Sequence, residues 1–459
     1  MKIKARTAIA VCMIGLLTLS GCNGIKTSTK YEDIKTKYKA GSSLTFFVTN
    51  DIHYLSKDLT DKGEAFQKFI DSGDGKQLNY IEEITDAFIG EIKEKKPQVL
   101  ILSGDLTNNG EKRSHEDLAK KLEKVKALGT LVYVVPGNHD VNNPWARSFK
   151  GNQQIETDYI SAGDFAKIYG DFGYKDAILR DENSLSYLAA PSEDLWLLML
   201  DTAQYKYNEI MREPETDGEI SKETFQWIEK CSALAKSKGA KLITVMHHSL
   251  IDHSSVVRKG FTLNNSEEAV RKFSDYDIPL TLTGHIHIQD IASHTKTGLN
   301  ENKGEIYDIA SGALSVYPQQ YGVLKYSPKE SSFDYSTSKV DINTWAKKND
   351  IKDKNLLDFS EYSKKAFGER AYNMAYSKLS MEDIYSEQQL KEMCSTVELL
   401  NLSYFAGTLK EYAAKIKDTA GYKFFEASND SFYKNYVTSL SKEKLLDGNK
   451  LHITLEKTK

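Results

Sequence analysis

Short apolar runs alternate with amphipathic stretches between residues 44 and about 340. Six apolar runs have the near-continuous hydrophobicity of buried strands, namely 44–53, 98–105, 131–140, 195–201, 241–248 and 279–287. Stretches with a helical spacing of apolar positions lie between them, at 78–96, 114–129, 221–238 and 266–275. Buried strands separated by helices are typical of sheets that are covered on both faces. We therefore expect an α/β fold for this region.

The pattern changes twice further along the chain. After residue 288 come four strand-like runs without intervening helices, QDIASHTK, EIYDIASGA, YGVLKYS and SFDYSTSKV, which predict a second sheet or an antiparallel edge. From residue 342 onward, aromatic residues and leucines punctuate a Lys- and Glu-rich background, which predicts four or five helices. The pattern thus divides this part of the chain into an α/β domain at 43–341 and a helical C-terminal domain at 342–459.

The first residues have the layout of an export signal. A basic start precedes a charge-free run from Ala8 to Leu19, which is too short to span a membrane as a helix. The run ends in LSGC, and the small pair before Cys22 resembles the lipobox of bacterial lipoproteins. The resemblance implies a signal peptide at 1–21, a lipid on Cys22 and a tether at 22–42, with the protein held on the extracellular face of the cytoplasmic membrane. The alternative is an ordinary cleaved signal followed by an incidental cysteine.

Net charge argues against one class of partner. The chain carries a formal charge of −4, and loss of the three basic residues of the signal makes it −7. An acidic protein has no electrostatic attraction to duplex nucleic acid, so we expect no stable nucleic-acid partner.

Two cysteines, Cys231 and Cys394, lie beyond the signal and Cys22, and their spacing does not decide whether they form a disulfide.

Residues of metal-ligand type follow the predicted strands. They are Asp51 and His53, Asp105, Asn138 and His139, His247 and His248, and His285 and His287. Six of the ten histidines of the chain fall at these positions, although a single histidine or Gly-Asp turn is common in proteins without such a role. Because ligands of open sheets collect outside the carboxyl ends of the strands, five separate strand ends would converge on one crevice.

The chain resembles the calcineurin-like metallophosphoesterase family over residues 44–320. The resemblance rests on the ordered set Asp51-x-His53, Gly104-Asp105, Gly137-Asn138-His139-Asp140, His247 and Gly284-His285-x-His287. It implies a four-layer α-β-β-α sandwich, to which the C-terminal helices are an addition. It also implies a metal-dependent hydrolase of phosphoric esters.

The resemblance implies a role for each residue of the set. One divalent ion would be held by Asp51, His53 and His287, the other by Asn138, His247 and His285, and both would be bridged by Asp105. His139 would face the substrate as a general acid, with Asp140 to orient it. His248 stays an alternative to His247 as the strand-end ligand.

The ligand types favour a particular group of metals. Mixed nitrogen and oxygen ligation suits Mn²⁺ and Fe, with Zn²⁺ as a further candidate, better than Mg²⁺ or Ca²⁺. A carboxylate has two oxygens with which to bridge a pair of ions, which a neutral imidazole does not have. Coordination lowers the pKa of water strongly, so the resemblance implies a metal-bridged hydroxide as the nucleophile.

Departures from sister branches narrow the substrate class. Asn108 stands where purple acid phosphatases carry a tyrosine, and the block GDLTNNGEKRS lacks the Asp-Arg-Gly of serine/threonine protein phosphatases. Gly-Asp-Leu-Thr followed by Gly110 is most similar to the bacterial cyclic nucleotide phosphodiesterase branch. We therefore expect a small phosphoester substrate, a cyclic nucleotide.

Loops at the predicted strand ends carry the candidate specificity residues. Arg147, His248 and Arg258 are the substrate-binding candidates, and an aromatic residue of the loop at 141–184 would stack on a nucleobase unless these aromatics only pack the insertion. Two other functions stay open. One is a broad phosphomonoesterase or nucleotidase that scavenges phosphate. The other is a lipid-anchored binding protein with a vestigial metal site, against which the intact ligand set argues.

Overall fold

The structure, a computed structural model, describes residues 34–295, 304–429, 431–439 and 445–455. The predicted signal peptide at 1–21 and the lipid acceptor Cys22 lie outside the described residues. The compact unit from Thr36 to Lys459 contains every element named below. Within the described ranges, no helix has the length and hydropathy that a membrane crossing needs.

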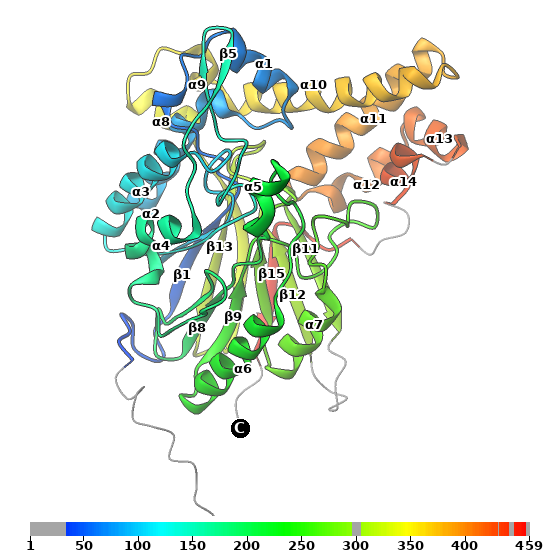
Figure 1. Ribbon diagram of the computed structural model, residues 1–459. Coiled ribbons are helices and arrows are strands. Elements are labelled where there is room, and N and C mark those ends of the chain that lie inside the picture. The colour runs from blue at the N-terminus through cyan, green and yellow to red at the C-terminus, as the bar shows by residue number, and fades with distance from the viewer. Residues whose placement is uncertain (1–33, 296–303, 430, 440–444, 456–459) are drawn as a thin grey trace, which may run out of the picture. The chain divides into compact units, whose positions relative to one another are not determined.

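Two sheets pack against each other through a shared apolar core (Figure 1). The first has the order β15-β14-β13-β1-β2-β3, with β1 (Leu44–Thr49), β2 (Val99–Ser103), β3 (Leu131–Val135), β13 (Gln320–Ser327), β14 (Ser332–Lys339) and β15 (Lys450–Thr454). The second has the order β11-β12-β10-β9-β8-β7-β6, with β6 (Leu179–Arg180), β7 (Tyr187–Ala189), β8 (Leu195–Met199), β9 (Lys241–Val245), β10 (Leu280–Thr283), β11 (Asp290–Thr295) and β12 (Glu305–Ala310). Strands β1, β2 and β3 are parallel, and so are β8, β9 and β10, so their carboxyl ends share one edge of each sheet.

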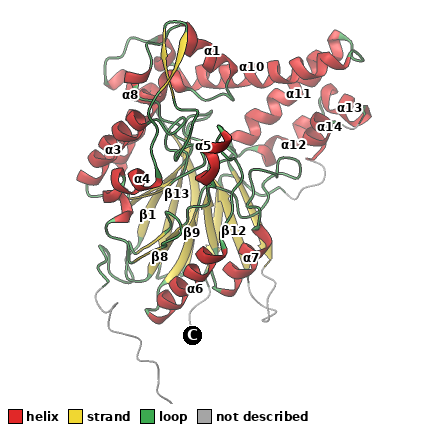
Figure 2. Ribbon diagram, in the orientation of Figure 1, coloured by secondary structure: helices red, strands yellow, loops and turns green. Residues whose placement is uncertain are grey.

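Helices cover the outer faces of both sheets (Figure 2). The first sheet is covered by α2 (Ile81–Lys95) and α3 (Lys112–Ala127), and the second by α6 (Lys222–Ser237) and α7 (Ser266–Asp275). Shorter elements lie in the connections, namely α1 (Glu64–Ser72), the hairpin β4 (Arg147–Lys150) and β5 (Gln153–Glu156), α4 (Ala162–Ile168) and α5 (Asn208–Met211). These four layers confirm the predicted α-β-β-α sandwich.

The local sequence explains the central strands. All five residues of β2 (VLILS) and of β8 (LWLLM) are buried, because each strand has a helical layer on one face and the other sheet on the opposite face. Helix α6, which lies between β8 and β9 in the chain, begins with a capping interaction. The Ser221 hydroxyl accepts a hydrogen bond from the backbone N–H of Thr224 at the start of α6.

The C-terminal helices pack on one end of the sandwich (Figure 1). They are α8 (Ile342–Lys348), α9 (Lys354–Leu357), α10 (Phe359–Leu379), α11 (Glu387–Phe405), α12 (Leu409–Lys417), α13 (Ala420–Ala427) and α14 (Phe432–Thr438). Their apolar core also contains Ile286 and Ile288, which follow β10. Cys231 on α6 and Cys394 on α11 are both free and buried, which settles the pairing that their spacing left open.

The segment at 342–459 is not wholly helical, contrary to the sequence prediction. Strand β15 pairs with β14 in antiparallel register and buries Ile453 in the core between the sheets. The apolar pattern did not reveal this strand, because a short edge strand with a single buried position has no distinct periodicity.

The predicted tether also ends earlier than residue 42. Tyr38 donates its backbone N–H to the carbonyl of Pro191, and its own carbonyl accepts from the N–H of Glu193. Lys39 forms an ion pair with the Glu193 carboxylate. The chain is therefore fixed to the α/β domain from Tyr38 onward.

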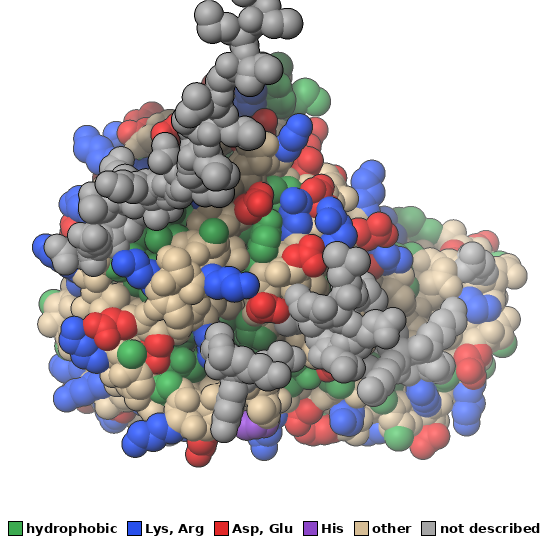
Figure 3. Space-filling view, turned by 90° about the horizontal axis from the view of Figure 1, so that it is seen from below, with side chains coloured by type: hydrophobic (Ala, Val, Ile, Leu, Met, Phe, Trp, Pro, Cys, Tyr) green, Lys and Arg blue, Asp and Glu red, His purple; other side chains and the backbone are tan. Residues whose placement is uncertain are grey.

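Charged side chains of both signs are interspersed on the face seen in Figure 3. Lysines and arginines alternate with acidic residues across it and do not gather in one basic field. The sequence as a whole is also nearly balanced, with 61 basic and 65 acidic residues.

Substitution of Ile453 tests whether β15 belongs to the core of the sandwich. We expect Ile453→Ala to lower the free energy of unfolding by about 2–5 kcal/mol, because it removes buried methyl groups and leaves a cavity. The matched control Lys450→Ala lies on an exposed position of the same strand and should change it by less than about 0.5 kcal/mol. Urea unfolding measures both, and equal effects of the two substitutions would contradict the assignment.

Candidate metal centre

Five strand ends bring the predicted ligands together. Asp51 and His53 follow β1, Asp105 follows β2, Asn138 and His139 follow β3, His247 follows β9, and His285 and His287 follow β10. All of these side chains are buried except those of His139 and His287, which keep partial exposure. The carboxyl edges of the two sheets therefore meet at one polar centre, as the sequence pattern predicted.

The backbone turns sharply at the ligand positions. Five of these residues have a left-handed φ, namely Asp51 (47°), His53 (47°), Asp105 (48°), His285 (68°) and His287 (63°). L-residues rarely adopt this conformation, and such strain concentrates at functional sites where the surrounding structure holds it in place. The turns take the side chains out of the strand direction and into the crevice.

A first cluster lies around Asp51. The Nε2 atoms of His53 and His287 are 3.2 Å apart, and His287 Nε2 is 3.3 Å from Asp51 Oδ1. His53 Nε2 also lies 3.8 Å from Asp51 Oδ1 and 3.7 Å from Asp105 Oδ2. The four donor atoms thus surround one point.

A second cluster shares Asp105 with the first. His247 Nε2 lies 3.3 Å from Asp105 Oδ2 and 3.1 Å from Asn138 Oδ1. The other nitrogen of His247 is 2.9 Å from the Ser103 carbonyl oxygen, to which it donates, so Nε2 is the atom that faces the cluster. His285 completes the group, with its ring centroid 4.8 Å from that of His247.

This donor set fits two divalent cations. The ligand atoms form two groups, and within each group all atoms lie within 4.8 Å of one another. Asp105 belongs to both groups. Asp51 Oδ1 is buried and has no hydrogen-bond donor among the residues that the structure describes. A buried carboxylate oxygen without a donor costs free energy unless a cation satisfies it. Imidazole nitrogens mixed with carboxylate and amide oxygens suit Mn²⁺, Fe or Zn²⁺.

The electrostatics of the centre keep Asp105 ionised and His53 and His285 neutral, whereas His247 holds a proton that a bound cation would displace. Burial would raise the pKa of Asp105, but His247 and His139 hold it well below its usual range. Burial would lower the pKa of His247, which the Asp105 carboxylate instead raises to about 9. Burial lowers the pKa of His53 and of His285, so both rings are neutral and able to coordinate.

His139 lies beside the two clusters and not within either of them. Its Nδ1–H donates to the carbonyl oxygen of Asn108 at 2.8 Å and to Asn109 Oδ1 at 2.9 Å. Its Nε2 is 3.9 Å from Asp105 Oδ2, and its ring is 21% exposed. The ring is thus fixed by one nitrogen and presents the other to the crevice.

Asp140 does not orient His139, contrary to the sequence prediction. The Asp140 carboxylate accepts hydrogen bonds from the backbone N–H groups of Leu106, Thr107 and Gly137, and from the Thr107 hydroxyl. Its oxygens are occupied by the two loops that carry Asp105 and Asn138, because these loops leave adjacent strands. Asp140 therefore holds the loop that carries Asp105 against the loop that carries Asn138.

Two glycines pack against the centre too closely for a side chain. A Cβ atom on Gly137 would lie 2.2 Å from Asp105 Oδ1. A Cβ atom on Gly104, whose φ is also left-handed at +98°, would lie 2.4 Å from His247 Nδ1. The glycines of the two motifs are therefore required by space around Asp105.

The three substrate-binding candidates have partners within the protein. His248 is buried, with Nδ1 2.8 Å from the Thr202 hydroxyl and Nε2 3.0 Å from the Thr216 carbonyl. Both ring nitrogens are thus engaged, so His248 is neither the strand-end ligand nor free to contact a substrate.

The two arginines differ in how firmly they are held. Arg147 donates to the carbonyls of Pro144 and Ala146 at the base of β4, which holds its side chain against its own loop. Arg258 is 61% exposed and forms an ion pair of 2.5 Å with Asp252. A surface ion pair contributes little free energy, so Arg258 could leave Asp252 and bind a substrate phosphate instead. Of the three candidates, only Arg258 is therefore still proposed to bind substrate.

Sequence reasoning missed a cation at the edge of the centre. Lys76, between α1 and α2, lies 3.2 Å from Asp74 Oδ2, and that oxygen is 3.8 Å from His287 Nδ1. The Lys76 side chain is 13% exposed. Nothing in the sequence distinguishes this lysine from the many others, because only the fold brings its loop to His287.

A buried ion pair fixes the loop that holds His285. His253 Nδ1 lies 2.8 Å from Asp290 Oδ2, and Nε2 lies 3.3 Å from Asp308 Oδ2. Burial would lower the pKa of His253, but the two carboxylates raise it to about 10. The same loop carries Gly260, whose carbonyl accepts from His285 Nε2 at 2.7 Å. The ion pair thus supports a ligand from outside the centre.

The raised pKa of His253 predicts a pH-dependent stability. The pair contributes its full stabilisation below pH 6.5, the ordinary pKa of histidine, and loses it as the pH rises to about 10. We expect the difference in unfolding free energy between wild type and His253→Gln to shrink over this range in urea titrations. The control His452→Gln removes a surface pair with Asp334 and should change the stability by less than about 1 kcal/mol. A difference that grew with pH would contradict this account.

The sequence matches two family models. Residues 44–289 match the calcineurin-like phosphoesterase model, and residues 341–447 match the C-terminal domain of cyclic nucleotide phosphodiesterase. The first match spans more than half of the chain and contains every residue of the two clusters. A search of curated proteins by sequence finds no match.

Several solved structures are similar at low identity. A dimetal phosphatase from Danio rerio is 13% identical, with 64% of this chain and 95% of that chain covered and a TM-score of 0.42. GAP50, the anchor in the inner membrane complex of Plasmodium, is 13% identical, with 65% and 85% covered and a TM-score of 0.34. A proposed 5′-nucleotidase from Staphylococcus aureus in complex with alpha-ketoglutarate is 14% identical, with 62% and 51% covered and a TM-score of 0.35.

The family match and the geometry agree on the same residues. The matched segment supplies both clusters, the shared carboxylate and the histidine beside them. The chain therefore belongs to the calcineurin-like phosphoesterase family and is a metal-dependent hydrolase of phosphoesters.

Proposed function

We propose that the protein is a phosphodiesterase that hydrolyses cyclic nucleotides with two divalent cations, Mn²⁺ and/or Fe first among them. The observation that carries the proposal is the position of Asp105 Oδ2, which lies within 3.9 Å of ring nitrogens from three strand ends. The match of residues 341–447 to the C-terminal domain of cyclic nucleotide phosphodiesterase supports the substrate class.

The two clusters would hold one cation each, with Asp105 between them. Cations bound there supply a nucleophile at neutral pH and stabilise the charge that develops on the phosphoryl group. Asp51, His53 and His287 would hold the first, and Asn138, His247 and His285 the second. The tight packing of Gly104 and Gly137 keeps the shared carboxylate in place.

His139 would protonate the leaving oxygen. Its Nδ1–H is held by Asn108 and Asn109, so its Nε2 is the atom that faces a bound phosphoester. In its doubly protonated form His139 would pass the Nε2 proton to the sugar oxygen as a water oxygen adds to phosphorus and the phosphorus–oxygen bond of the cyclic ester breaks; burial lowers the pKa of His139, and the Asp105 carboxylate opposes that effect. Lys76 adds positive charge beside His287, where a phosphate anion would dock.

A substrate panel on the Mn²⁺-loaded protein lacking residues 1–22 tests the proposal. We expect turnover of 3′,5′- or 2′,3′-cyclic nucleotides to exceed that of cyclic dinucleotides and of phosphomonoesters. His139→Gln should lower kcat by about 10²–10⁴-fold for cyclic nucleotides, whose alkoxide leaving group needs a proton. The same substitution should lower kcat much less for a p-nitrophenyl diester, whose leaving group needs no proton.

The matched control is His294→Gln, on an exposed position of β11, which should leave kcat unchanged. Metal content, measured by atomic emission, should be the same in wild type and both variants. A wild-type enzyme that preferred monoesters would overturn the phosphodiesterase proposal in favour of a phosphate-scavenging phosphatase.

We also propose that a lipid on Cys22 anchors the enzyme to the extracellular face of the cytoplasmic membrane. The support is the basic start, the short apolar run and the LSGC sequence. We expect Cys22→Ser to move the enzyme from the membrane fraction of the cell to the soluble fraction and to abolish labelling by a radioactive fatty acid. Labelling that persisted in the variant would refute the anchor.

A further inference from the structure

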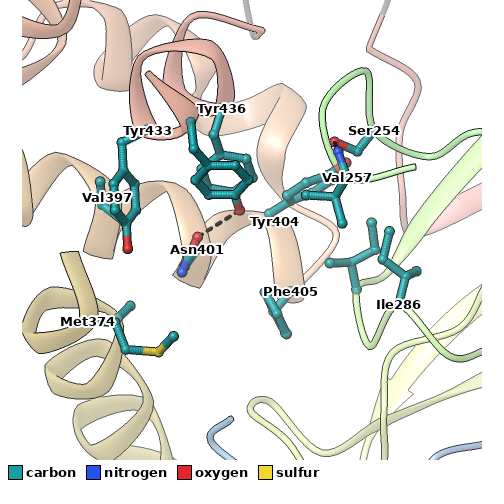
Figure 4. Close-up of a pocket in the computed structure, with 13 residues that line it drawn as sticks. Ser254, Val257, Ile286, Met374, Val397, Asn401, Tyr404, Phe405, Tyr433 and Tyr436 are labelled. Atoms are coloured by element: carbon teal, nitrogen blue, oxygen red, sulfur yellow. Dashed lines mark hydrogen bonds between the residues drawn. The ribbon is translucent and has the colours of Figure 1, made fainter. Parts of the chain in front are cut away.

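A cavity of about 210 Å³ lies between the C-terminal helices and the turn that carries two of the proposed metal ligands (Figure 4). Helices α10, α11 and α14 form one side of it. The other side is formed by Ile286 and Ile288, which follow β10, and by Val257 of the loop after β9. The hydrolytic mechanism above makes no use of this space.

The walls of the cavity are mainly aromatic and aliphatic. Figure 4 shows Tyr433 and Tyr436 of α14 together with Tyr404 and Phe405 of α11 around the cavity. Two polar residues, Ser254 and Asn401, interrupt this lining, and Asn401 Oδ1 accepts a hydrogen bond from the Tyr436 hydroxyl at 2.7 Å. The Asn401 side chain also carries an NH₂ group, which is a hydrogen-bond donor. Such walls suit a flat aromatic group with a polar edge.

The volume restricts the occupant to a small ring system. An apolar cavity of about 150 Å³ in another protein accommodates benzene, whereas pockets for drug-sized ligands begin at about 300 Å³. A volume of about 210 Å³ therefore fits one or two fused rings. Met374 and Phe432 line the cavity and are 49% and 55% exposed, so this edge reaches solvent.

The cavity and the metal centre share a stretch of backbone. Ile286 stands between His285 and His287, and consecutive Cα atoms are only about 3.8 Å apart. Val257 belongs to the loop whose Gly260 carbonyl holds His285. The turn that carries His285 and His287 thus forms part of the cavity wall through Ile286.

We propose that this cavity binds the nucleobase of the cyclic nucleotide, an inference that rests on the proposed function. The aromatic walls stack on the faces of the base, and the Asn401 amide meets its polar edge. The ribose then extends past Ile286, and the phosphate reaches the metal centre. On this account the C-terminal helices select nucleotides over other phosphodiesters, while the α/β domain carries out hydrolysis.

Two substitutions in the full-length protein test the proposal by different routes. Ala371→Phe fills the cavity from α10, and Tyr433→Ala removes one aromatic wall. The substrates are a cyclic nucleotide that wild type hydrolyses and the corresponding cyclic ribose phosphate without a base. Each variant should raise KM for the nucleotide at least tenfold and leave kcat/KM for the base-free ester within twofold. The matched controls Ala414→Phe and Tyr412→Ala, on exposed positions of α12, should change neither value.

A competing site for the base is Trp145, which is 46% exposed and follows His139 in the same loop. If Trp145→Ala raised KM for the nucleotide while both cavity variants left it unchanged, the base would bind there and the proposal would be overturned. The proposal would also be overturned if the cavity variants lowered kcat/KM equally for the nucleotide and for the base-free ester. Such a result would indicate that the substitutions displace the turn that carries His285 and His287.

Direct binding separates this proposal from the proposed function. We expect adenosine, guanosine, cytidine or uridine to bind wild type in calorimetry without any phosphate, and Ala371→Phe to weaken that binding at least tenfold. An enzyme that hydrolysed only monoesters would refute the phosphodiesterase proposal, and the nucleoside titration would still decide the cavity. Absence of nucleoside binding alongside normal hydrolysis of cyclic nucleotides would refute the cavity proposal alone.

Discussion

The site depends on one carboxylate that belongs to two groups of ligands at once. Asp105 is buried, and a buried anion is stable only where donors or cations surround it. Imidazoles from three strand ends provide that environment on one side, and the backbone N–H of His139 provides it on the other. Asp105 Oδ2 lies close to a histidine of each cluster. A shift of Asp105 would therefore remove a ligand from both clusters at the same time. The neighbouring loops, tied to each other by Asp140, prevent such a shift.

Most of the ligand set could be predicted because each residue directly follows an apolar strand in the chain. The run before Asp51 or the run before His285 identifies both a strand and the side chain at its end. The hydrogen bonds between the loops that follow these strands could not be predicted in the same way. That Asp140 bonds to the backbone of a neighbouring loop, or that Asn108 holds the His139 ring, depends on contacts between loops that leave different strands.

The C-terminal helices illustrate the same limit. The sequence predicts that their aromatic residues form an apolar core, and in the structure they do. This core also includes Ile286 and Ile288, which follow β10 beside the metal centre. The Tyr404 hydroxyl also donates to the carbonyl of His253, whose ring anchors the loop behind His285. A helical segment without catalytic residues of its own thus borders the site, and sequence pattern gives no means of detecting that contact.

Strand β15 has a consequence for how the molecule is assembled. Since it joins the first sheet after the helices, those helices are an insertion between two neighbouring strands and not an appendage. The first sheet gathers strands from residue 44 to residue 454, and pairings of such long range form slowly because much chain must be ordered first. The sheet that supports Asp51 and Asp105 is completed only when the helical region has already been synthesised. We therefore expect the two regions to unfold together.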